Sequence, residues 1–408
     1  MAGQKEQFEF INGIRGLAAL QVVLLHFCAI FFPAFARVAQ EGNYPLESVL
    51  SHTPLFFLID GYTAVFIFFL MSGFVLAGAF DNKVQQLPAQ TLKRFIRLFL
   101  PVAVSAVFAL GLFFAFQGAK EHTQAVTGSP WAAWLYHIDT APLALLREIG
   151  LNSMLLGYGG QSIFSNWSVL SLPAISTSSN PPLWTLHIEF WGSLLVLFLA
   201  AARNLLARSV FIGIFCCALL VTGTGQFSLF LLGFVAYHSR ERWLSREFNP
   251  TIGIILLFIG VLMSSLLGTW ASGTLLRALA SITYAQATSP EQFRDILTAI
   301  VIMLGICLSS PLRRLASARP LRWLGKISFS LYLVHFPILF TLGCSVFNVV
   351  FTRSTMLPAI LTTFIVILPL LLLIASLFER YVDQPAIRLA GHLVRATDRS
   401  HSLLQRSN

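Results

Sequence analysis

Charged residues are scarce in this chain. Asp, Glu, Lys and Arg make up 11% of its 408 residues, while 56% are hydrophobic. A soluble chain carries about 25% charged residues, so the composition excludes an ordinary soluble domain. Long polar stretches are also missing, which leaves no segment able to build a second core. The sequence therefore predicts one integral membrane domain, an all-α polytopic helical bundle.

Several chemical signatures are absent as well. The sequence holds no HxxxxD, GxSxG, HExxH or Walker motif, and its five cysteines show no CxxC spacing. Neither a metal site nor a disulfide framework is expected, and we predict no permanently bound cofactor. The N-terminus lacks the basic region and cleavage site of a secretory signal, so the first apolar run is expected to remain as a span.

Long apolar runs are plentiful. A span needs about 20 apolar residues, and on that basis we predict ten transmembrane helices, near residues 9–32, 56–80, 96–117, 183–202, 208–223, 226–239, 250–268, 293–310, 324–343 and 356–378. Residues 118–182 form the longest stretch outside these spans. Its moderately apolar part, 141–157, is predicted to be an interfacial or re-entrant helix.

The formal net charge of +10 would suggest nucleic acid in a soluble protein, but here its distribution indicates orientation. With the N-terminus inside, 20 of the 27 Lys and Arg residues fall in cytoplasmic segments and six in outer ones. Both termini are therefore predicted to be cytoplasmic, and nucleic acid is not a predicted partner. Residues 1–388 are predicted to form the membrane domain and 389–408 a polar, basic cytoplasmic tail.

The first span contains two ionisable residues, Arg15 and His26. They are 11 residues apart, or about three helical turns, so both project from the same helix face. Ionisable groups inside a membrane are costly and usually line a protein-filled or wet interior, which makes this pair a functional hypothesis.

His26 and Glu189 are predicted to lie at the same depth. Counting 1.5 Å per residue along the first and fourth spans places both about 9 Å below the outer surface. A carboxylate beside an imidazole fixes its tautomer and stabilises the imidazolium, as a general base requires. We therefore predict a catalytic pair; a buried structural hydrogen bond between helices is the alternative.

A basic run, KRFIRLF, lies where the third span begins. Arg94 and Arg97 are three residues apart, so they share a helix face and can hold one anion together with Arg15. A phosphorylated donor such as a coenzyme A thioester would suit them. The alternative is the positive-inside signal itself, with pairing to lipid headgroups, and for Lys93 that alternative is preferred.

Two further residues are candidates for the pocket. His335 falls near mid-membrane, where a lone imidazole needs a partner, and Asp60 begins the second span near the outer surface. Asp60 could approach His26 or could equally cap its own helix.

Two other features are expected to be structural. Ser72–Gly73 is predicted to allow close helix packing, and Glu379 and Asp383 to form a surface ion pair with Arg380.

Six segments together resemble the acyltransferase family 3 of integral membrane O-acyltransferases. In order they are IRGLAALQVVLLHF, FFLMSGFVL, KRFIRLFLP, LWTLHIEFW, LGKISFSLYLVHFPI and FERYVDQPA, and they cover nearly the whole chain. Two departures are visible: the basic motif begins Lys-Arg rather than Arg-Arg, and the closing motif reads Asp-Gln-Pro rather than Glu-Arg-Pro or Glu-Lys-Pro.

The resemblance implies a ten-helix enzyme that takes an acyl group, commonly acetyl, from acyl-coenzyme A at the cytoplasmic side. The acceptor would be a hydroxyl of a saccharide in an envelope or exported polysaccharide, a lipopolysaccharide or a glycoconjugate. It assigns catalysis to His26 and Glu189 and donor binding to Arg15, Arg94 and Arg97, and its late histidine is His335. The family's common use implies the cell inner membrane.

The working hypothesis is therefore a multi-pass membrane O-acyltransferase. The alternative is a proton-coupled transporter or flippase of a lipid or glycolipid, with Arg15, His26 and Glu189 as a proton relay. Apart from membrane lipids, the expected partners are acyl-coenzyme A and a saccharide or glycolipid acceptor. The sequence leaves the oligomeric state open, a homo-oligomer included.

Overall fold

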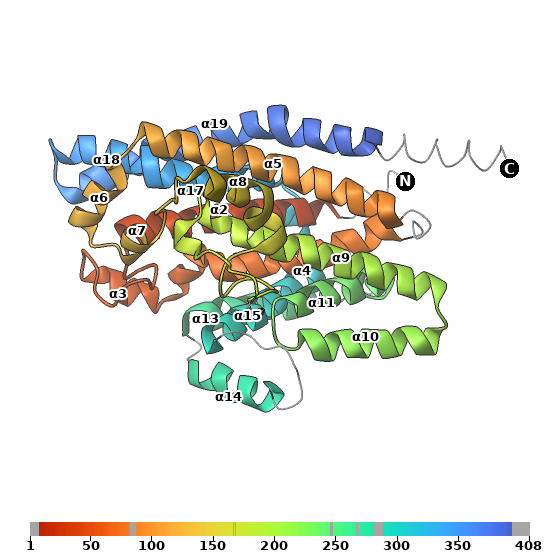
Figure 1. Cartoon of the computed structure of the whole chain (residues 1–408). Helices are drawn as coiled ribbons and strands as arrows, with labels where there is room; N and C mark the ends of the chain where they lie inside the picture. The colour runs from red at the N-terminus through yellow and green to blue at the C-terminus, as the bar shows by residue number, and fades with distance from the viewer. Residues whose placement is uncertain are drawn as a thin grey trace.

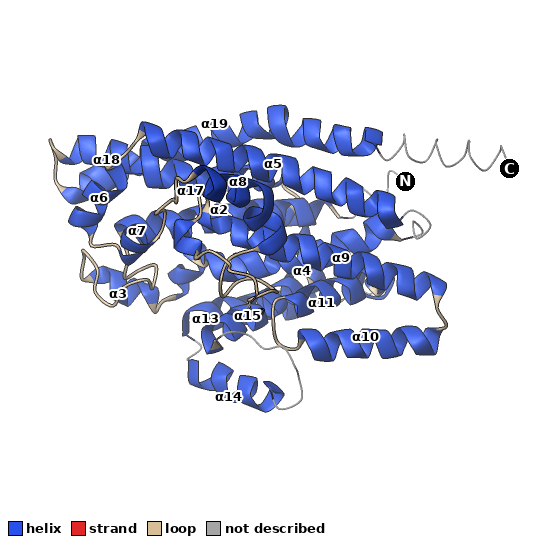
Figure 2. Cartoon of the chain, in the orientation of Figure 1, coloured by secondary structure: helices blue, strands red, loops and turns tan. Residues whose placement is uncertain are grey.

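The fold is helical in every part that the structure describes. The computed structural model describes residues 8–81, 87–165, 167, 169–244, 248–266, 269–280 and 289–393, and these ranges contain helices, turns and loops but no strand (Figure 2). The predicted all-α class is confirmed.

The helices follow one another along the chain as α2 (Glu9–Phe31), α3 (Leu46–Ser51), η1 (Pro54–Ile59), α4 (Gly61–Phe80), α5 (Leu87–Ala115), α6 (Ala119–Thr127), α7 (Pro130–Trp134), α8 (Pro142–Arg147), η3 (Glu148–Leu156), η4 (Ile175–Thr177), η5 (Pro181–Leu183), α9 (Trp184–Leu205), α10 (Arg208–Thr222), α11 (Phe227–His238), α12 (Arg240–Leu244), α13 (Pro250–Leu266), α14 (Thr269–Ala280), α15 (Pro290–Leu308), α16 (Ser310–Ala316), α17 (Arg319–Ile338), η6 (Leu339–Gly343), α18 (Cys344–Phe351), α19 (Met356–Phe378) and η7 (Glu379–Asp383).

Each of the ten segments predicted to span is helical over most of its described length, and residues 267 and 268 of the seventh segment lie outside the described residues. Among the described residues, six helices are long and apolar enough to cross a membrane. The pair α15 and α16, bent by 101°, is either a broken span, which would be the seventh, or a re-entrant loop. The helices α10, α11 and α13 are apolar but have only 15, 12 and 17 residues. At 1.5 Å per residue each is shorter than the roughly 30 Å hydrocarbon core. A multi-pass membrane protein follows from this, while the count of ten crossings stays a prediction.

The long helices run side by side, and the described chain begins and ends at the same end of the bundle (Figure 1). The segment predicted to be interfacial is also helical, as α8 and η3, and its Leu143 and Leu146 are 78% and 70% exposed. The last helix continues from α19 through η7 to Leu393. The rest of the predicted tail, 394–408, lies outside the described residues.

The first helix, α2, lies at the centre and packs against α17 and α4. Its contact with α17 depends on glycine. A Cβ added to Gly325 would lie 1.9 Å from the carbonyl oxygen of Asn12, and one added to Gly16 would lie 2.6 Å from the Gly325 nitrogen. The two backbones therefore touch, which holds the residues of α2 and α17 in a fixed register.

A second close contact joins α4 to α11. A Cβ on Gly73 would lie 2.3 Å from the carbonyl oxygen of Phe230, and one on Gly233 would lie 2.2 Å from that of Leu70. The prediction that Ser72–Gly73 allows close packing is confirmed at Gly73.

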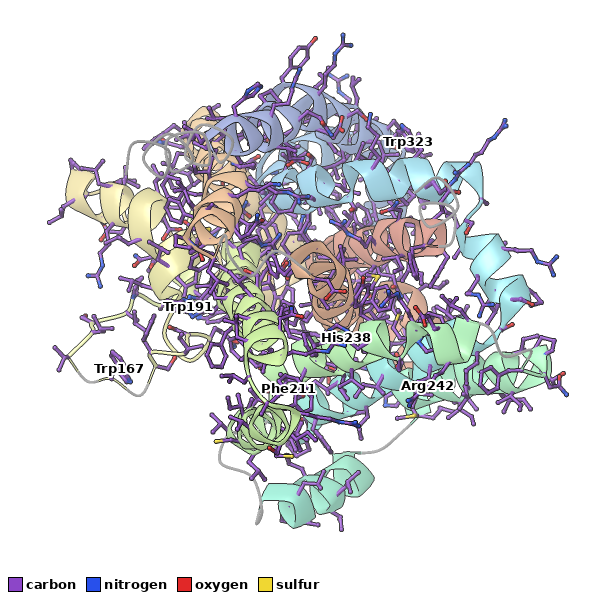
Figure 3. The ribbon with its side chains drawn as sticks, turned by 90° about the vertical axis from the view of Figure 1, so that its right-hand side faces the viewer. Trp167, Trp191, Phe211, His238, Arg242 and Trp323 are labelled. Atoms are coloured by element: carbon purple, nitrogen blue, oxygen red, sulfur yellow. The ribbon has the colours of Figure 1, made fainter. Side chains whose placement is uncertain are left out.

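Other helices lie at the edge of the bundle. Figure 3 looks along the helices from the end where the described chain begins and ends, and it shows α10, marked by Phe211, set apart from the centre. None of the residues of α10 is buried, as expected of a helix that faces lipid or a partner.

The α2–α17 contact can be tested with alanine. We expect Gly325→Ala to lower the free energy of unfolding by about 1–3 kcal/mol, because the added Cβ forces two backbones apart. The measurement is thermal unfolding of the purified protein in detergent. Gly111→Ala is the matched control, since Gly111 is also helical and nothing lies within 4 Å of an added Cβ; it should leave stability unchanged or raise it. Equal melting temperatures for both variants would contradict the claim that the α2–α17 contact requires glycine at position 325.

Candidate active site

A cavity of about 330 Å³ lies between α2, α4, α5, α9, α17 and η7, at the end of the bundle where the described chain begins and ends. We term it the basic cavity. Five cations and two carboxylates line it, a formal net charge of +3: Arg15, Arg94, Arg97, Arg322, Lys326, Glu189 and Asp383. The three arginines predicted to bind an anion therefore share one cavity, although they come from two distant segments.

Within this cavity Arg94 and Glu189 form an ion pair, with Nη2 donating to Oε1. Their side chains are only 11% and 17% exposed, and the pairing offsets the cost of removing both charges from water. No described residue accepts a hydrogen bond from the buried Nε of Arg94. A buried donor without an acceptor costs about 1–3 kcal/mol, so this nitrogen is suited to meet an acceptor on a bound ligand.

The predicted contact between His26 and Glu189 is wrong. Glu189 faces the basic cavity, whereas His26 lines a different pocket. The prediction placed the start of the fourth span at the outer surface, but Asn180 and Leu183 are fully buried, and Asn180 Nδ2 donates to the Leu333 carbonyl of α17 at 2.8 Å. Because α9 begins inside the protein, counting residues from the outer surface gives the wrong position for Glu189.

His26 lines an apolar pocket of about 110 Å³, which we term the histidine pocket. Its wall includes Val22 and Leu25 of α2, Val65 of α4 and Trp131 of α7. Nδ1 of His26 lies 2.8 Å from the carbonyl oxygen of Val22. Since a carbonyl only accepts hydrogen bonds, the proton of a neutral His26 belongs on Nδ1, and Nε2 carries the basic lone pair.

His335 lies behind His26 and is fully buried. Its Nδ1 is 2.7 Å from the Tyr332 carbonyl oxygen, which places its proton there, and its Nε2 is 3.3 Å from Nδ1 of His26. Nε2 of His335 can therefore accept from the Nδ1–H of His26. The partner that His335 was predicted to need is thus His26. Beside His26, the imidazole of His335 takes the place that the prediction gave to the carboxylate of Glu189.

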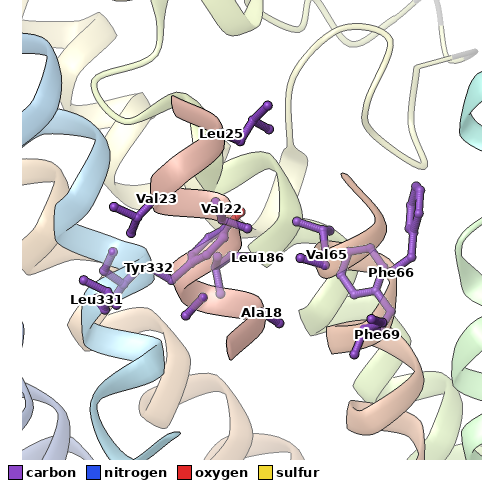
Figure 4. Packing of buried hydrophobic residues seen from close by; sticks show 14 of the residues in the cluster. Ala18, Val22, Val23, Leu25, Val65, Phe66, Phe69, Leu186, Leu331 and Tyr332 are labelled. Carbon is purple, nitrogen blue, oxygen red and sulfur yellow. The ribbon is translucent and has the colours of Figure 1, made fainter. Parts of the chain in front are cut away.

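Tyr332 and Val65 line both the basic cavity and the histidine pocket. Figure 4 shows the Tyr332 ring extending from α17 toward α2 and α4. Its hydroxyl lies 2.7 Å from Oγ1 of Thr185 and 2.9 Å from the Pro182 carbonyl oxygen. These two residues thus lie between the cavity of the arginines and the pocket of His26.

A larger cleft of about 880 Å³ adjoins the histidine pocket on its other side. We term it the tryptophan cleft, because Trp131, Trp134 and Trp184 line both spaces. Its polar wall includes Asp60 and Asp295. The array of tryptophans and polar groups was not found from the sequence, because these residues lie on separate short segments.

Asp60 proves to be a helix cap. It accepts from the Thr63 nitrogen at 3.0 Å, from Thr63 Oγ1 at 2.7 Å and from Ser264 Oγ at 2.6 Å. It faces the tryptophan cleft rather than the histidine pocket. Of the two predicted roles, capping is confirmed.

The closing motif FERYVDQPA holds two carboxylates that are buried rather than at the surface. Glu379 is 4% exposed and pairs with Lys326 at 3.5 Å, and Asp383 is 7% exposed and lines the basic cavity. The predicted surface ion pair with Arg380 is therefore wrong, because η7 turns these carboxylates toward α17. The sequence did contain a signal for the cations that these carboxylates approach. Arg322 and Lys326 are four residues apart and therefore share a face of α17.

One buried carboxylate organises the loop over the histidine pocket. Oε1 of Glu148 accepts from the Tyr158 hydroxyl at 2.9 Å, the Ser178 hydroxyl at 2.8 Å and the Ser179 nitrogen at 3.0 Å. Burial raises the pKa of Glu148, and these hydrogen bonds lower it by less. The anchor fixes the chain directly before Pro181 and Pro182, which line the pocket.

Comparison with known proteins gives a consistent identification. The sequence profile of a family described as "Acyltransferase domain" matches residues 8–378. The chain is also 26% identical over 424 aligned positions to "O-acetyltransferase PaAT-1" of Phomopsis amygdali, covering 93% of this chain and 83% of that protein. No solved structure matches the chain.

The Glu148 anchor can be tested with two substitutions. Glu148→Ala should cost about 1–3 kcal/mol of stability, because the buried donors around Oε1 lose their acceptor. Glu148→Gln keeps an oxygen there and should stay near the wild type.

The anchor also predicts a pH dependence. Because the folded pKa of Glu148 is raised, its contribution favours folding at low pH and is lost as the pH rises through that pKa. Thermal unfolding measured between about pH 4 and 8 should show this decline in the wild type and a smaller one in Glu148→Gln. Identical pH profiles would contradict it.

Proposed function

The chain belongs to acyltransferase family 3 and is a membrane O-acyltransferase, and on that premise we propose that it transfers a short acyl group, acetyl above all, from acyl-coenzyme A to a hydroxyl of a saccharide. One observation carries this proposal. A basic cavity suited to a phosphorylated donor adjoins a pocket that holds a neutral imidazole base, with Tyr332 and Val65 as their common wall.

The donor occupies the basic cavity. Its formal charge of +3 attracts the phosphates of coenzyme A, and Arg15, Arg94 and Arg97 hold them. Glu189 is not the partner of the base in this proposal. It orients Arg94 through their ion pair, so that the unpaired Nε faces the ligand. Glu189 is thus a positioning residue.

The pantetheine arm then extends toward His26. Arg15 and His26 are about 16 Å apart along α2, so an extended arm brings the thioester past Tyr332 to the histidine pocket. Nε2 of His26 removes the proton of the acceptor hydroxyl as its oxygen attacks the thioester carbonyl. The carbon–sulfur bond breaks, the imidazolium returns the proton to the sulfur, and the products are free coenzyme A and an ester.

His335 supports this proton transfer. While His26 is protonated, its Nδ1–H donates to Nε2 of His335 and to the Val22 carbonyl oxygen, 3.3 and 2.8 Å away. Two acceptors on the far side of the ring stabilise the imidazolium without a neighbouring carboxylate.

The acceptor enters through the tryptophan cleft. Flat indole faces can cover the apolar face of a sugar ring, while carboxylates such as Asp295 accept from its hydroxyls. A saccharide, free or carried on a lipid or other glycoconjugate, fits this combination. The basic cavity then faces the cytoplasm and the cleft the opposite side of the cell inner membrane, with both termini cytoplasmic and ten crossings.

The reaction can be followed by release of free coenzyme A. Purified protein in vesicles, supplied with acetyl-coenzyme A and a glycan or glycolipid extract, should release the thiol and label a component of the extract. His26→Ala should lower kcat by about 10²–10⁴-fold, the usual contribution of a general base.

A folded wild-type protein that binds no coenzyme A and shows no turnover over a broad acceptor panel would refute the donor assignment. Turnover retained in His26→Ala would instead refute the role of His26 and leave the donor site standing.

The phosphate-binding role predicts a different effect for Arg94. Arg94→Ala should weaken coenzyme A binding by about 10–100-fold, as for the loss of a charge-assisted hydrogen bond of about 1.5–3 kcal/mol. Isothermal titration measures it. Arg208→Ala is the matched control, because Arg208 is exposed at the start of α10. The affinity of this variant for coenzyme A should equal that of the wild type. Equal affinities for both variants would exclude Arg94 from the donor site.

A further inference from the structure

One buried carboxylate in the wall of the basic cavity has no partner. Asp383 lines this cavity and is 7% exposed, and no described residue donates a hydrogen bond to its buried Oδ1. No Lys, Arg or His nitrogen of the described residues lies within 4 Å of the carboxylate. Buried carboxylates are normally paired or hydrogen-bonded, because an unpaired charge is costly to remove from water. The missing partner is therefore expected on a ligand.

The surroundings of Asp383 make its isolation informative. Glu189, the other carboxylate in the cavity wall, pairs with Arg94. The charges of Arg97, Glu379 and Arg15 act on Asp383, and Glu379 pairs with Lys326 at 3.5 Å. Arg97 and Arg15 line the same cavity as Asp383 without pairing to it. The structure thus holds a carboxylate and guanidinium groups in one cavity but apart from each other.

The unpaired groups of the cavity wall are of two kinds. The Nε atoms of Arg94 and Arg322 are buried donors without an acceptor in the described part of the chain, and Oδ1 of Asp383 is a buried acceptor without a donor. Phosphate oxygens can satisfy the two nitrogens, but they repel the carboxylate. Only an N–H or O–H group can satisfy Asp383. The fitting ligand therefore carries phosphates and, beside them, a hydrogen-bond donor.

Coenzyme A has both kinds of group. Its diphosphate is flanked on one side by the hydroxyl and amide N–H groups of the pantetheine arm and on the other by the ribose and adenine. A carboxylate in an anion site weakens the binding of phosphate alone, and this loss is recovered only by a ligand that donates a hydrogen bond to it. Such an arrangement selects among anions by repelling the wrong ones.

We propose that Asp383 accepts a hydrogen bond from a hydroxyl or N–H group beside the phosphates of the donor, so that the basic cavity selects coenzyme A over anions that carry phosphate alone. This inference rests on the proposed acyltransferase function and adds a donor-binding residue to it. The alternative role of Asp383 is charge compensation alone, in which its carboxylate only lowers the positive charge of the cavity.

The two roles predict opposite changes in coenzyme A affinity. Isothermal titration compares coenzyme A with trimetaphosphate, a cyclic phosphate anion that has no proton to donate at neutral pH. In Asp383→Ala, coenzyme A should bind about tenfold more weakly, as for the loss of a hydrogen bond to a charged group. Trimetaphosphate should bind about two- to tenfold more tightly, because a repelling charge is gone. If both ligands bind more tightly, the inference is overturned.

Asp383→Asn separates the hydrogen bond from the charge. The amide keeps an acceptor oxygen and removes the negative charge, so coenzyme A affinity should stay within about threefold of the wild type while trimetaphosphate binds more tightly. An equal loss of coenzyme A affinity in both variants would contradict the hydrogen bond. If Asp383→Ala does not fold, Asp383→Asn still decides, because charge compensation alone predicts that both ligands gain affinity equally.

Two fragments of the donor locate the hydrogen bond. Phosphopantetheine carries the arm without the nucleotide, and adenosine bisphosphate carries the nucleotide without the arm. A loss of affinity in Asp383→Ala for phosphopantetheine places the contact on the arm, and a loss for adenosine bisphosphate places it on the nucleotide.

Glu241→Ala is the matched control, because Glu241 is 89% exposed and does not line the basic cavity, so the variant removes the same charge elsewhere. Its affinities for coenzyme A and trimetaphosphate should equal those of the wild type. Changes equal to those in Asp383→Ala would overturn the inference.

Failure of this inference is distinguishable from failure of the proposed function. A wild-type protein that binds no coenzyme A loses both. A protein that transfers acetyl in a His26-dependent reaction, and whose coenzyme A affinity does not fall in Asp383→Ala, keeps its function and loses only the role of Asp383.

Discussion

The backbone contact between α2 and α17 is the constraint on which the site depends. Gly16 and Gly325 let the two helices touch where any side chain would force them apart. Further along the same pair of helices, His26 and His335 then lie 3.3 Å apart, and Tyr332 projects between the basic cavity and the histidine pocket. His26, His335 and Tyr332 are thus positioned by a single interface between two helices.

The charges of the site are arranged around this interface according to their desolvation cost. The arginines lie in the basic cavity, where Glu189 and Asp383 compensate part of their charge, and the remaining excess is available for an anionic ligand. The imidazoles of His26 and His335 are buried, and His26 lines a largely apolar pocket. A permanent charge in such surroundings would be expensive, whereas an imidazole can be uncharged. The arginines and the imidazoles therefore occupy two different environments, and Tyr332 and Val65 lie at their boundary.

Sequence reasoning succeeded for the helices and for individual residues, and it failed where a distance between helices was needed. The apolar runs predicted the ten helical segments, and the basic run predicted that Arg94 and Arg97 share a helix face; both line the basic cavity. Pairing His26 with Glu189 failed because depth was counted from an assumed surface, while α9 begins in the interior beside α17. Likewise, η7 turns Glu379 and Asp383 away from the surface position that their neighbour Arg380 suggested.

The sequence by itself determined that the chain is a helical membrane protein, because hydrophobicity and the need to satisfy every backbone hydrogen bond leave few alternatives. It also indicated that His26 and His335 are buried, since an ionisable group inside an apolar run needs protein around it, but it did not indicate that Glu379 and Asp383 are. Only the tertiary structure decided which of them meet. The partners of Arg94, His26 and Tyr332 lie 95, 309 and 147 residues away along the chain. Such contacts depend on how the helices are shifted, rotated and spaced relative to one another. Glycine contacts and buried loop ends set this arrangement, and no local sequence pattern encodes it.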